Sequence, residues 1–407
     1  MSQAGLASRF ALFRDADFVR LWVVGGIGEG VRWMQILAMS VYAYDVTGSV
    51  LAVTAVNFLR SIPLLLFGAV LGALADRLDG RRLLVWSVVI PGTATLAIGV
   101  QALLGVVEVW HIGIAAFANG LAFTAEMPVR RSMLAEVAGQ DRLAAAMGFD
   151  GITRQAMRAL GPALGGFFLQ MVGLHGAYLV ATLGYVVSLP LIWRVIPRPP
   201  RAATADTRQP GLIATTLDGL RYVRREPAMI GFLVVCLTAQ VLLFPYASLL
   251  AVMGREVFQI TPFEVGLLAA TEGSGALTGA LLAAVIAAPR NYRFLYIGGS
   301  MLFAAGIVGY VHAPGFALAA VFLFATGMGI GFFSTMQATL PQYAAVPEMR
   351  SRIMGLISMA IGISPFGLLH VGLLADHFGP RLASTVIGVE ALVILALVAL
   401  RWRGRLA

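Results

Sequence analysis

Four charged side chains stand inside long apolar stretches of the sequence, where a charge is rarely placed without a task. Glu29 and Arg32 are three residues apart, Arg60 lies in the next apolar stretch, and Glu272 lies in the second half of the chain. A charge at the centre of a membrane costs at least about 2.5–3.5 kcal/mol, so such residues are expected to be paired and functional. The spacing of Glu29 and Arg32 places both on one face of a helix, within reach of each other.

These side chains could bind and release a proton. A carboxyl group in a low dielectric has a raised pKa, and a neighbouring arginine lowers it again, so a carboxyl that exchanges one environment for the other changes its protonation. Glu29 is the first candidate for proton coupling, with Arg32 beside it and Arg60 across the gap to the next helix, and Glu272 is the second. The alternative is a permanent structural ion pair between Glu29 and Arg32 that never titrates.

A second charged stripe follows further along the chain. Asp150, Arg154 and Arg158 recur every four residues, so they share one helix face. The Asp150–Arg154 pair lies near the inner end of that helix, where a structural role is common. Four arginines inside helices face four buried carboxylates, two of which, Glu126 and Asp150, lie near the inner surface. A central cavity would then be neutral to slightly positive, which suits an anionic or phenolic substrate better than a polycation.

Uncharged polar and aromatic residues within the apolar stretches are candidates for the substrate cavity. The alternative for each is a hydrogen bond between helices, which is the commoner use of Tyr or Gln on a membrane helix. The candidates are Trp33, Gln35, Tyr42, Asn57, Gln240, Tyr246, Gln337 and His370.

The elements that carry these residues are predicted to be membrane helices. Only 12% of the residues are charged, 59% are hydrophobic, and the mean hydropathy is +0.85, against roughly 25% charged residues in soluble domains. A helix needs about 20 apolar residues to cross the hydrocarbon core. The sequence therefore predicts an all-α polytopic membrane protein with twelve spans, at residues 18–44, 49–74, 82–104, 110–131, 142–169, 172–196, 227–253, 261–288, 291–312, 314–341, 350–374 and 380–402.

The net charge of +9 reflects membrane orientation and not nucleic-acid binding. All 29 basic residues are arginine. In the predicted topology four of them lie inside helices, two (Arg255 and Arg381) lie on the outer side, and the other 23 lie in the tails and alternate loops of one side. Positive residues collect on the cytoplasmic side. We therefore expect both termini to be cytoplasmic, in the plasma (inner) membrane of a bacterium, with no cleaved signal peptide.

The chain also repeats itself. Phe117-Ala118-Asn119-Gly120 is echoed by Phe324-Ala325-Thr326-Gly327 at an offset of 207, and Met147-Gly148 is echoed by Met354-Gly355 at the same offset. Between the two copies lies a polar, proline-rich segment. The predicted organisation is an N-terminal six-helix half (1–196), a cytoplasmic linker (197–226) and a C-terminal six-helix half (227–407). Two six-helix repeats with a site between them form a known plan for transporters that alternate access by rocking.

Two motifs carry a resemblance to a known family. Residues 72–82 read Gly-Ala-Leu-Ala-Asp-Arg-Leu-Asp-Gly-Arg-Arg, and residues 161–166 read Gly-Pro-Ala-Leu-Gly-Gly. The first is similar to the helix 2–3 signature of the major facilitator superfamily, and the second to its antiporter motif, with Met157 where that motif has a further glycine. Asp79, Pro128-Val129-Arg130-Arg131 and residues 347–352 resemble the branch that contains the enterobactin exporter and macrolide efflux pumps.

The resemblance implies roles for these motif residues. Gly72, Asp76, Arg77, Asp79, Arg81 and Arg82 would form a gating motif that latches the inner side. The alternative is that the arginines only anchor the helices on the cytoplasmic side. Arg154, Arg158, Gly161, Pro162, Gly165 and Gly166 would form the helix 5 motif, in which glycines permit close helix packing. The alternative there is tight packing with no bearing on the direction of transport.

The sequence also excludes several function classes. No phosphate-binding loop or HExxH metal motif is present, and the single cysteine permits neither an internal disulfide nor a cysteine metal cluster. We expect no enzyme activity, cofactor, metal or nucleic-acid partner. The prediction is a monomeric secondary transporter in the lipid bilayer, a proton-coupled exporter of a small amphipathic molecule such as a siderophore or drug. The alternatives are a facilitator or importer of a metabolite, ion or lipid, and a sensor that binds ligand without moving it.

Overall fold

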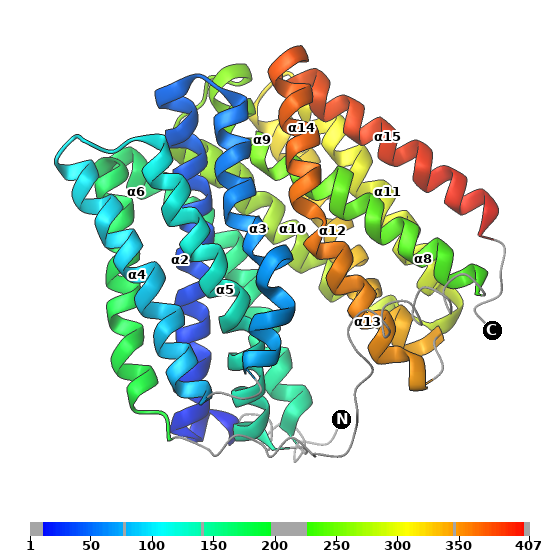
Figure 1. Cartoon of the computed structure of the whole chain (residues 1–407). Helices are drawn as coiled ribbons and strands as arrows, with labels where there is room; N and C mark the ends of the chain where they lie inside the picture. Colours follow the sequence, from blue (N-terminus) through cyan, green and yellow to red (C-terminus); the bar gives the residue numbers. More distant parts are fainter. Residues whose placement is uncertain (1–10, 76–78, 140–141, 197–225, 345–346, 403–407) are drawn as a thin grey trace. The chain divides into compact units, whose positions relative to one another are not determined.

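The computed structural model describes residues 11–75, 79–139, 142–196, 226–344 and 347–402, and within these ranges it contains helices and no strands (Figure 1). The chain divides into two compact units. Unit 1 comprises Met1–Tyr42 and Leu59–Ala205, and unit 2 comprises Ala43–Phe58 and Asp206–Ala407. The turn between the first two long helices thus groups with the C-terminal part of the chain. The predicted linker, 197–226, lies outside the described residues except for Glu226.

Unit 1 is built from one short helix and five long apolar ones. The short helix is η1 (Ala11–Arg14), and the long ones are α2 (Ala16–Thr47), α3 (Val50–Ala75), α4 (Gly80–Leu103), α5 (Val109–Ala138) and α6 (Leu143–Trp193). The adjoining ends of α2 and α3 belong to unit 2. At 51 residues, α6 would extend for about 77 Å as one straight helix, far more than a bilayer core of about 30 Å. Gly173 interrupts it with φ 73° and ψ −173°, a conformation that glycine adopts at little cost. The break agrees with the predicted boundary between the fifth and sixth spans.

Unit 2 contains the remaining elements. They are α8 (Pro227–Thr238), η3 (Ala239–Leu243), η4 (Phe244–Ser248), α9 (Leu249–Val252), η5 (Met253–Val257), α10 (Pro262–Ile286), η6 (Pro289–Asn291), α11 (Tyr292–Val311), α12 (Phe316–Ala344), α13 (Pro347–Gly362), α14 (Ser364–Phe378) and α15 (Pro380–Arg401). The α12 helix packs along both α10 and α11, and α14 runs beside α15 (Figure 1). Thr261 caps α10 by accepting a hydrogen bond from the backbone N–H of Glu264, a standard way to satisfy the first turn.

Two predicted spans are less regular than the sequence suggests. The span predicted at 227–253 is not one α-helix, because it passes through π-helical η3, 3₁₀-helical η4, a single α turn and π-helical η5 before it ends at Val257. The span predicted at 350–374 is divided into α13 and α14 at Ile363. Pro245 lies in η4 and Pro365 at the start of α14; a proline removes a backbone donor and breaks the regular α-helical ladder.

Ten helices in the described part of the chain are long and apolar enough to cross a membrane. The α2 helix is not one of the ten, although it has 32 residues. It carries Asp17, Arg20, Glu29, Arg32 and Asp45, which lower its hydropathy. The protein is therefore a multi-pass membrane protein, and the predicted total of twelve spans stays a prediction.

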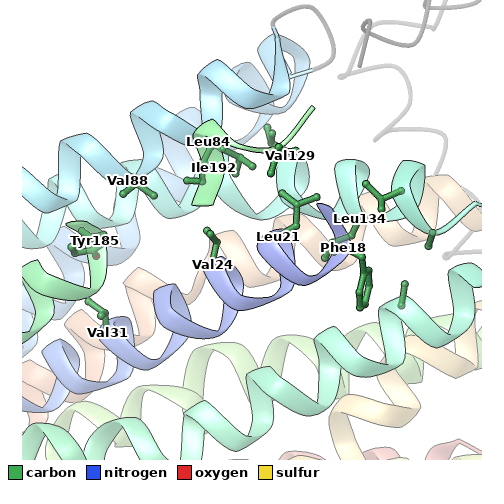
Figure 2. Close-up of a cluster of buried hydrophobic side chains, with 14 of the residues drawn as sticks. Phe18, Leu21, Val24, Val31, Leu84, Val88, Val129, Leu134, Tyr185 and Ile192 are labelled. Atoms are coloured by element: carbon green, nitrogen blue, oxygen red, sulfur yellow. The ribbon is translucent and has the colours of Figure 1, made fainter. Parts of the chain in front are cut away.

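Unit 1 has a continuous apolar core at one end of its helices. Figure 2 shows Phe18, Leu21 and Val24 of α2 meeting side chains of the other helices. Those partners include Leu84 and Val88 of α4, Val129 and Leu134 of α5, and Tyr185 and Ile192 of α6. Dispersion contacts of this kind hold membrane helices together where the lipid offers no hydrophobic driving force. The packing fixes α2, the helix that carries Glu29 and Arg32, within unit 1.

Candidate functional site

The Glu29–Arg32 pair forms as the three-residue spacing predicts. The Arg32 guanidinium bonds the Glu29 carboxylate through Nη2 and Oε2. Glu29 is 7% exposed, whereas the Arg32 side chain retains 23% exposure. Arg32 also lies over the Phe123 ring, 4.0 Å from its centroid, which is a cation–π contact. The charge of this pair is therefore held in place by both α2 and α5.

A second aromatic residue joins α2 to α6. The Arg158 guanidinium lies 5.0 Å from the centroid of the Trp33 ring, and that of Arg32 lies 5.6 Å from it. Trp33, predicted to be a cavity residue, thus stands between two cations within unit 1. The arrangement accounts for the aromatic residue at this position without a bound substrate.

Glycines of the helix 5 motif bring the α6 and α2 backbones together. A Cβ at Gly165 would stand 2.4 Å from the Met34 carbonyl oxygen, and one at Gly161 would stand 2.5 Å from Cβ of Trp33. No larger side chain fits at either position without moving a helix. Met157 replaces the upstream glycine of the motif, and its sulfur faces Gly30, where a Cβ would come within 3.2 Å. The small residue required for this contact is thus supplied by α2.

The predicted stripe on α6 forms only in part. Asp150 and Arg154 pair at 3.5 Å, but the shorter bond of Asp150, at 2.5 Å, comes from Arg130 of α5. Arg130 also lies 3.4 Å from Glu126 and is almost fully buried. Its guanidinium fills the space left by Gly25, where a Cβ would meet it at 2.1 Å. Sequence spacing missed this link between helices, because residues 130 and 150 lie on different helices.

Arg60 has a different environment from the other arginines within unit 1. Among the described residues, Arg32 pairs with Glu29, and both Arg130 and Arg154 pair with Asp150. None of these ion pairs includes Arg60. Its Nε is buried and has no hydrogen-bond partner there, and the residue as a whole is half-buried. The Nε atoms of Arg32 and Arg130 are in the same situation, so what distinguishes Arg60 from those two is the lack of an ion pair among the described residues. Arg32 and Glu29 are close enough to act on its charge electrostatically. Arg60 is thus a cation near the Glu29–Arg32 pair but outside it.

In unit 2 the buried Glu272 of α10 meets Tyr246. The Tyr246 hydroxyl donates to Oε2 of Glu272 at 2.6 Å, and both residues are buried. The contact depends on the irregular helix, because Tyr246 lies in the 3₁₀ segment η4, directly after the π segment η3. Such interruptions often mark functional positions or hinges. Two residues named separately from the sequence, one for protons and one for the cavity, are therefore brought together.

Other cavity candidates have partners of their own. Gln35 donates to Thr95 at 2.8 Å and Gln337 donates to Cys236 at 3.0 Å, which are helix-to-helix bonds. Asn57 donates to the Val53 carbonyl one turn earlier. Gln240 is buried within η3, and Tyr42 is half-buried near the end of α2. For Gln35 and Gln337, at least, the structural alternative fits the contacts.

His370 lies 3.6 Å from Glu390, a residue that the sequence reasoning missed. The side chains are 42% and 44% exposed, and they come from α14 and α15. Glu390 lies in the middle of an apolar helix, and this position in the sequence was the signal that could have identified it.

The gating motif is only partly described. Asp76 and Arg77 lie outside the described residues, and Gly72 lies within α3. Asp79 caps α4 by accepting from the Arg81 backbone, and it stands 3.8 Å from Arg82. The Arg81 guanidinium stacks 5.2 Å from the Trp193 ring. These contacts order the start of α4, and the latch stays a prediction.

No group of three or more His, Cys, Asp and Glu residues in the described ranges is arranged to hold a metal ion. The charged residues of unit 1 instead form ion pairs between and within helices, and in unit 2 Glu272 is hydrogen-bonded by Tyr246.

Comparisons with known proteins place the chain in a family. The sequence model of the Major Facilitator Superfamily matches residues 21–367 of this chain. Macrolide efflux protein A of Streptococcus pyogenes is 22% identical over 89% of this chain and 90% of its own length. The staphyloferrin A transporter of Staphylococcus aureus is 23% identical over 83% and 84%. These relatives confirm the resemblance to macrolide efflux pumps that the motifs predicted.

Solved structures agree on the fold. A point mutant of the nucleoside transporter NupG superposes with a TM-score of 0.76 over 95% of this chain and all of that one, at 13% identity. At so low a sequence identity, the match supports similarity of fold and not of substrate. The chain belongs to the Major Facilitator Superfamily and is a membrane transporter rather than an enzyme.

Proposed function

We propose that the protein is a proton-coupled exporter of a small amphipathic molecule such as a siderophore or drug. The observation that carries the proposal is the Glu29–Arg32 pair, a buried carboxylate held by an arginine on a membrane helix. If that contact loosens during transport, the carboxyl can take up a proton, and it releases the proton when the contact re-forms. The name of one relative, a macrolide efflux protein, supports export, and the name of the other, a staphyloferrin A transporter, supports a siderophore as a substrate.

Within this proposal the chain forms twelve spans in two six-helix repeats, a half at 1–196 and a half at 227–407 with a cytoplasmic linker at 197–226. The halves rock about a central site to alternate access. Both termini face the cytoplasm, and the protein acts as a monomer in the bacterial inner membrane. The arginine asymmetry supports the orientation. The motif residues and the cavity candidates other than Trp33, Gln35 and Gln337 keep the roles that the sequence predicts for them.

Direction-resolved transport tests the proposal. The purified full-length chain is reconstituted into proteoliposomes, and uptake of a radiolabelled macrolide and of iron-free staphyloferrin A is measured with an imposed pH gradient of either sign. We expect accumulation on the acidic side of the membrane, lost when an ionophore collapses the gradient. Movement that follows only the substrate gradient, regardless of pH, would instead identify the alternative, a facilitator or importer of a metabolite, ion or lipid.

A further inference from the structure

The position of Arg60 is fixed by the α5 helix. A Cβ at Gly120 would stand 1.9 Å from the Arg60 carbonyl oxygen, so α5 contacts the α3 backbone at this residue. One turn further along α5, Phe123 supports the Arg32 guanidinium. The same short segment of α5 therefore positions both Arg32 and Arg60.

The same packing occurs in unit 2 at a residue of opposite charge. A Cβ at Gly327 would stand 2.0 Å from the Glu272 carbonyl oxygen. Gly120 and Gly327 are the last residues of the two echoed segments, at an offset of 207. By this packing Arg60 in unit 1 and Glu272 in unit 2 occupy equivalent positions in the repeat. The two repeats thus place a cation and a carboxylate at the same point of their folds.

The two equivalent residues differ in how their charge is satisfied. Glu272 accepts a bond from the Tyr246 hydroxyl. Arg60 has a buried Nε with no hydrogen-bond partner among the described residues, and Arg32, its cationic neighbour, already holds Glu29. Among the described residues Arg32 and Arg130 each form ion pairs with carboxylates, and none of those ion pairs involves Arg60. A buried donor without a partner is costly in free energy. A ligand group that accepts its hydrogen bond would therefore gain binding free energy.

We propose that Arg60 binds the carboxylate or phenolate of an aromatic, amphipathic substrate, with the Phe123 and Arg32 region beside it. The inference rests on the proposed transport function and names its substrate class. Arginine suits this task because its planar fork matches a carboxylate with two hydrogen bonds and stays charged at all relevant pH values. The equivalent Glu272 stays the second candidate for the coupled proton, after Glu29, and the anion site at Arg60 does not depend on which of the two carries it.

Binding to protein at rest tests the proposal without any transport. The full chain is placed in nanodiscs of phosphatidylcholine, and equilibrium binding of 2-naphthoate is compared with that of the 2-naphthylmethylammonium cation, which has the same ring. The variants are Arg60→Gln, which removes the charge, and Arg60→Lys, which keeps the charge and loses the fork. Arg142→Gln is the matched control, because it removes one positive charge from a residue that bonds only the Ala138 carbonyl in the described structure.

We expect the wild-type chain to prefer the anion. Because hydrogen bonds to charged groups contribute about 1.5–3 kcal/mol, Arg60→Gln should weaken 2-naphthoate binding about tenfold or more. Arg60→Lys should bind with intermediate affinity, and Arg142→Gln should match the wild type. Preference for the cation, no binding of the anion at millimolar concentration, or equal anion binding by wild type and Arg60→Gln would each overturn the proposal. Thermal unfolding shows whether each variant folds. If Arg60→Gln does not fold, the affinity of Arg60→Lys for 2-naphthoate decides the test, and an affinity equal to that of the wild type would then overturn the proposal.

A lipid headgroup could supply the same anionic chemistry, and a second arm separates the two sources. Nanodiscs with about one-fifth phosphatidylglycerol should leave 2-naphthoate affinity nearly unchanged if the site takes the substrate. A loss that disappears in Arg60→Gln would assign Arg60 to an anionic lipid and refute the substrate role. The result is independent of transport direction and coupling, so the proposed function can fail in proteoliposomes while this anion site is still found.

Discussion

Replacing Glu29 by glutamine separates the two interpretations of the Glu29–Arg32 pair. The new amide would keep the size of a protonated carboxyl and carry no charge. If Glu29 carries the coupled proton, the variant should fold, exchange substrate across the membrane and fail to accumulate it against a gradient. If the pair is only structural, the variant should lose stability, because Arg32 would remain as an uncompensated charge.

The size of that loss follows from the environment of Arg32. Breaking a fully buried ion pair costs roughly 3–5 kcal/mol. The Arg32 side chain keeps 23% exposure and its contact with Phe123, so we expect a cost of about 1–3 kcal/mol if the pair is fixed. The double variant Glu29→Gln/Arg32→Gln removes both charges and should recover most of it, since neither partner is left alone.

Thermal unfolding in detergent and transport in proteoliposomes, measured on the same preparations, provide the assay. The proton-carrier interpretation requires retained exchange with no proton-driven accumulation. Unchanged proton-driven accumulation by Glu29→Gln would refute any role for Glu29 in coupling. A large loss of stability that the double variant repairs, with transport lost only in proportion to folded protein, would show that the pair is structural.

Three further predictions concern topology, gating and packing. In a Cys236→Ser background, an impermeant thiol reagent added from outside should label Pro314→Cys, at an exposed position after α11, and miss Arg208→Cys; the reverse pattern would contradict the orientation. Asp76→Asn should slow counterflow while the protein stays folded; normal counterflow would favour simple anchoring of the helix 2–3 loop. Gly165→Leu should destabilise the protein by at least about 1–3 kcal/mol through overpacking, because a Cβ there already meets Met34 at 2.4 Å. Gly148→Leu, where a Cβ meets nothing within 4 Å, is the matched control in unfolding experiments and should cost less.

Much of the architecture is determined by the sequence alone. Apolar stretches of about 20 residues define membrane helices wherever they occur, because unpaired backbone groups are too costly in lipid. The Glu29–Arg32 contact was also predictable, since a three-residue spacing on one helix fixes which side chains are neighbours. The helix 5 glycines indicated a close helix contact, and they do contact the α2 backbone at Gly30 and Met34.

Contacts between helices were decided only by the tertiary structure. Spacing pairs Asp150 with Arg154 on its own helix, yet the shorter bond of Asp150 comes from Arg130 on α5. Helical periodicity states which residues share a face but not which face of another helix it meets. That choice depends on side-chain packing along the whole contact, including the glycine that leaves room for the Arg130 guanidinium.

The backbone irregularity in unit 2 is a second feature that the sequence pattern did not predict. The sequence from 227 to 253 is mostly apolar and favours one continuous helix, but η3 and η4 change the hydrogen-bond pattern and place Tyr246 against Glu272. A π or 3₁₀ segment is less common in a helix than an α turn, and its position is not encoded by a simple periodicity, so tertiary contacts select it. Composition and spacing thus determined a membrane transporter with charged residues in its helices, and the packing of those helices decided which charges meet.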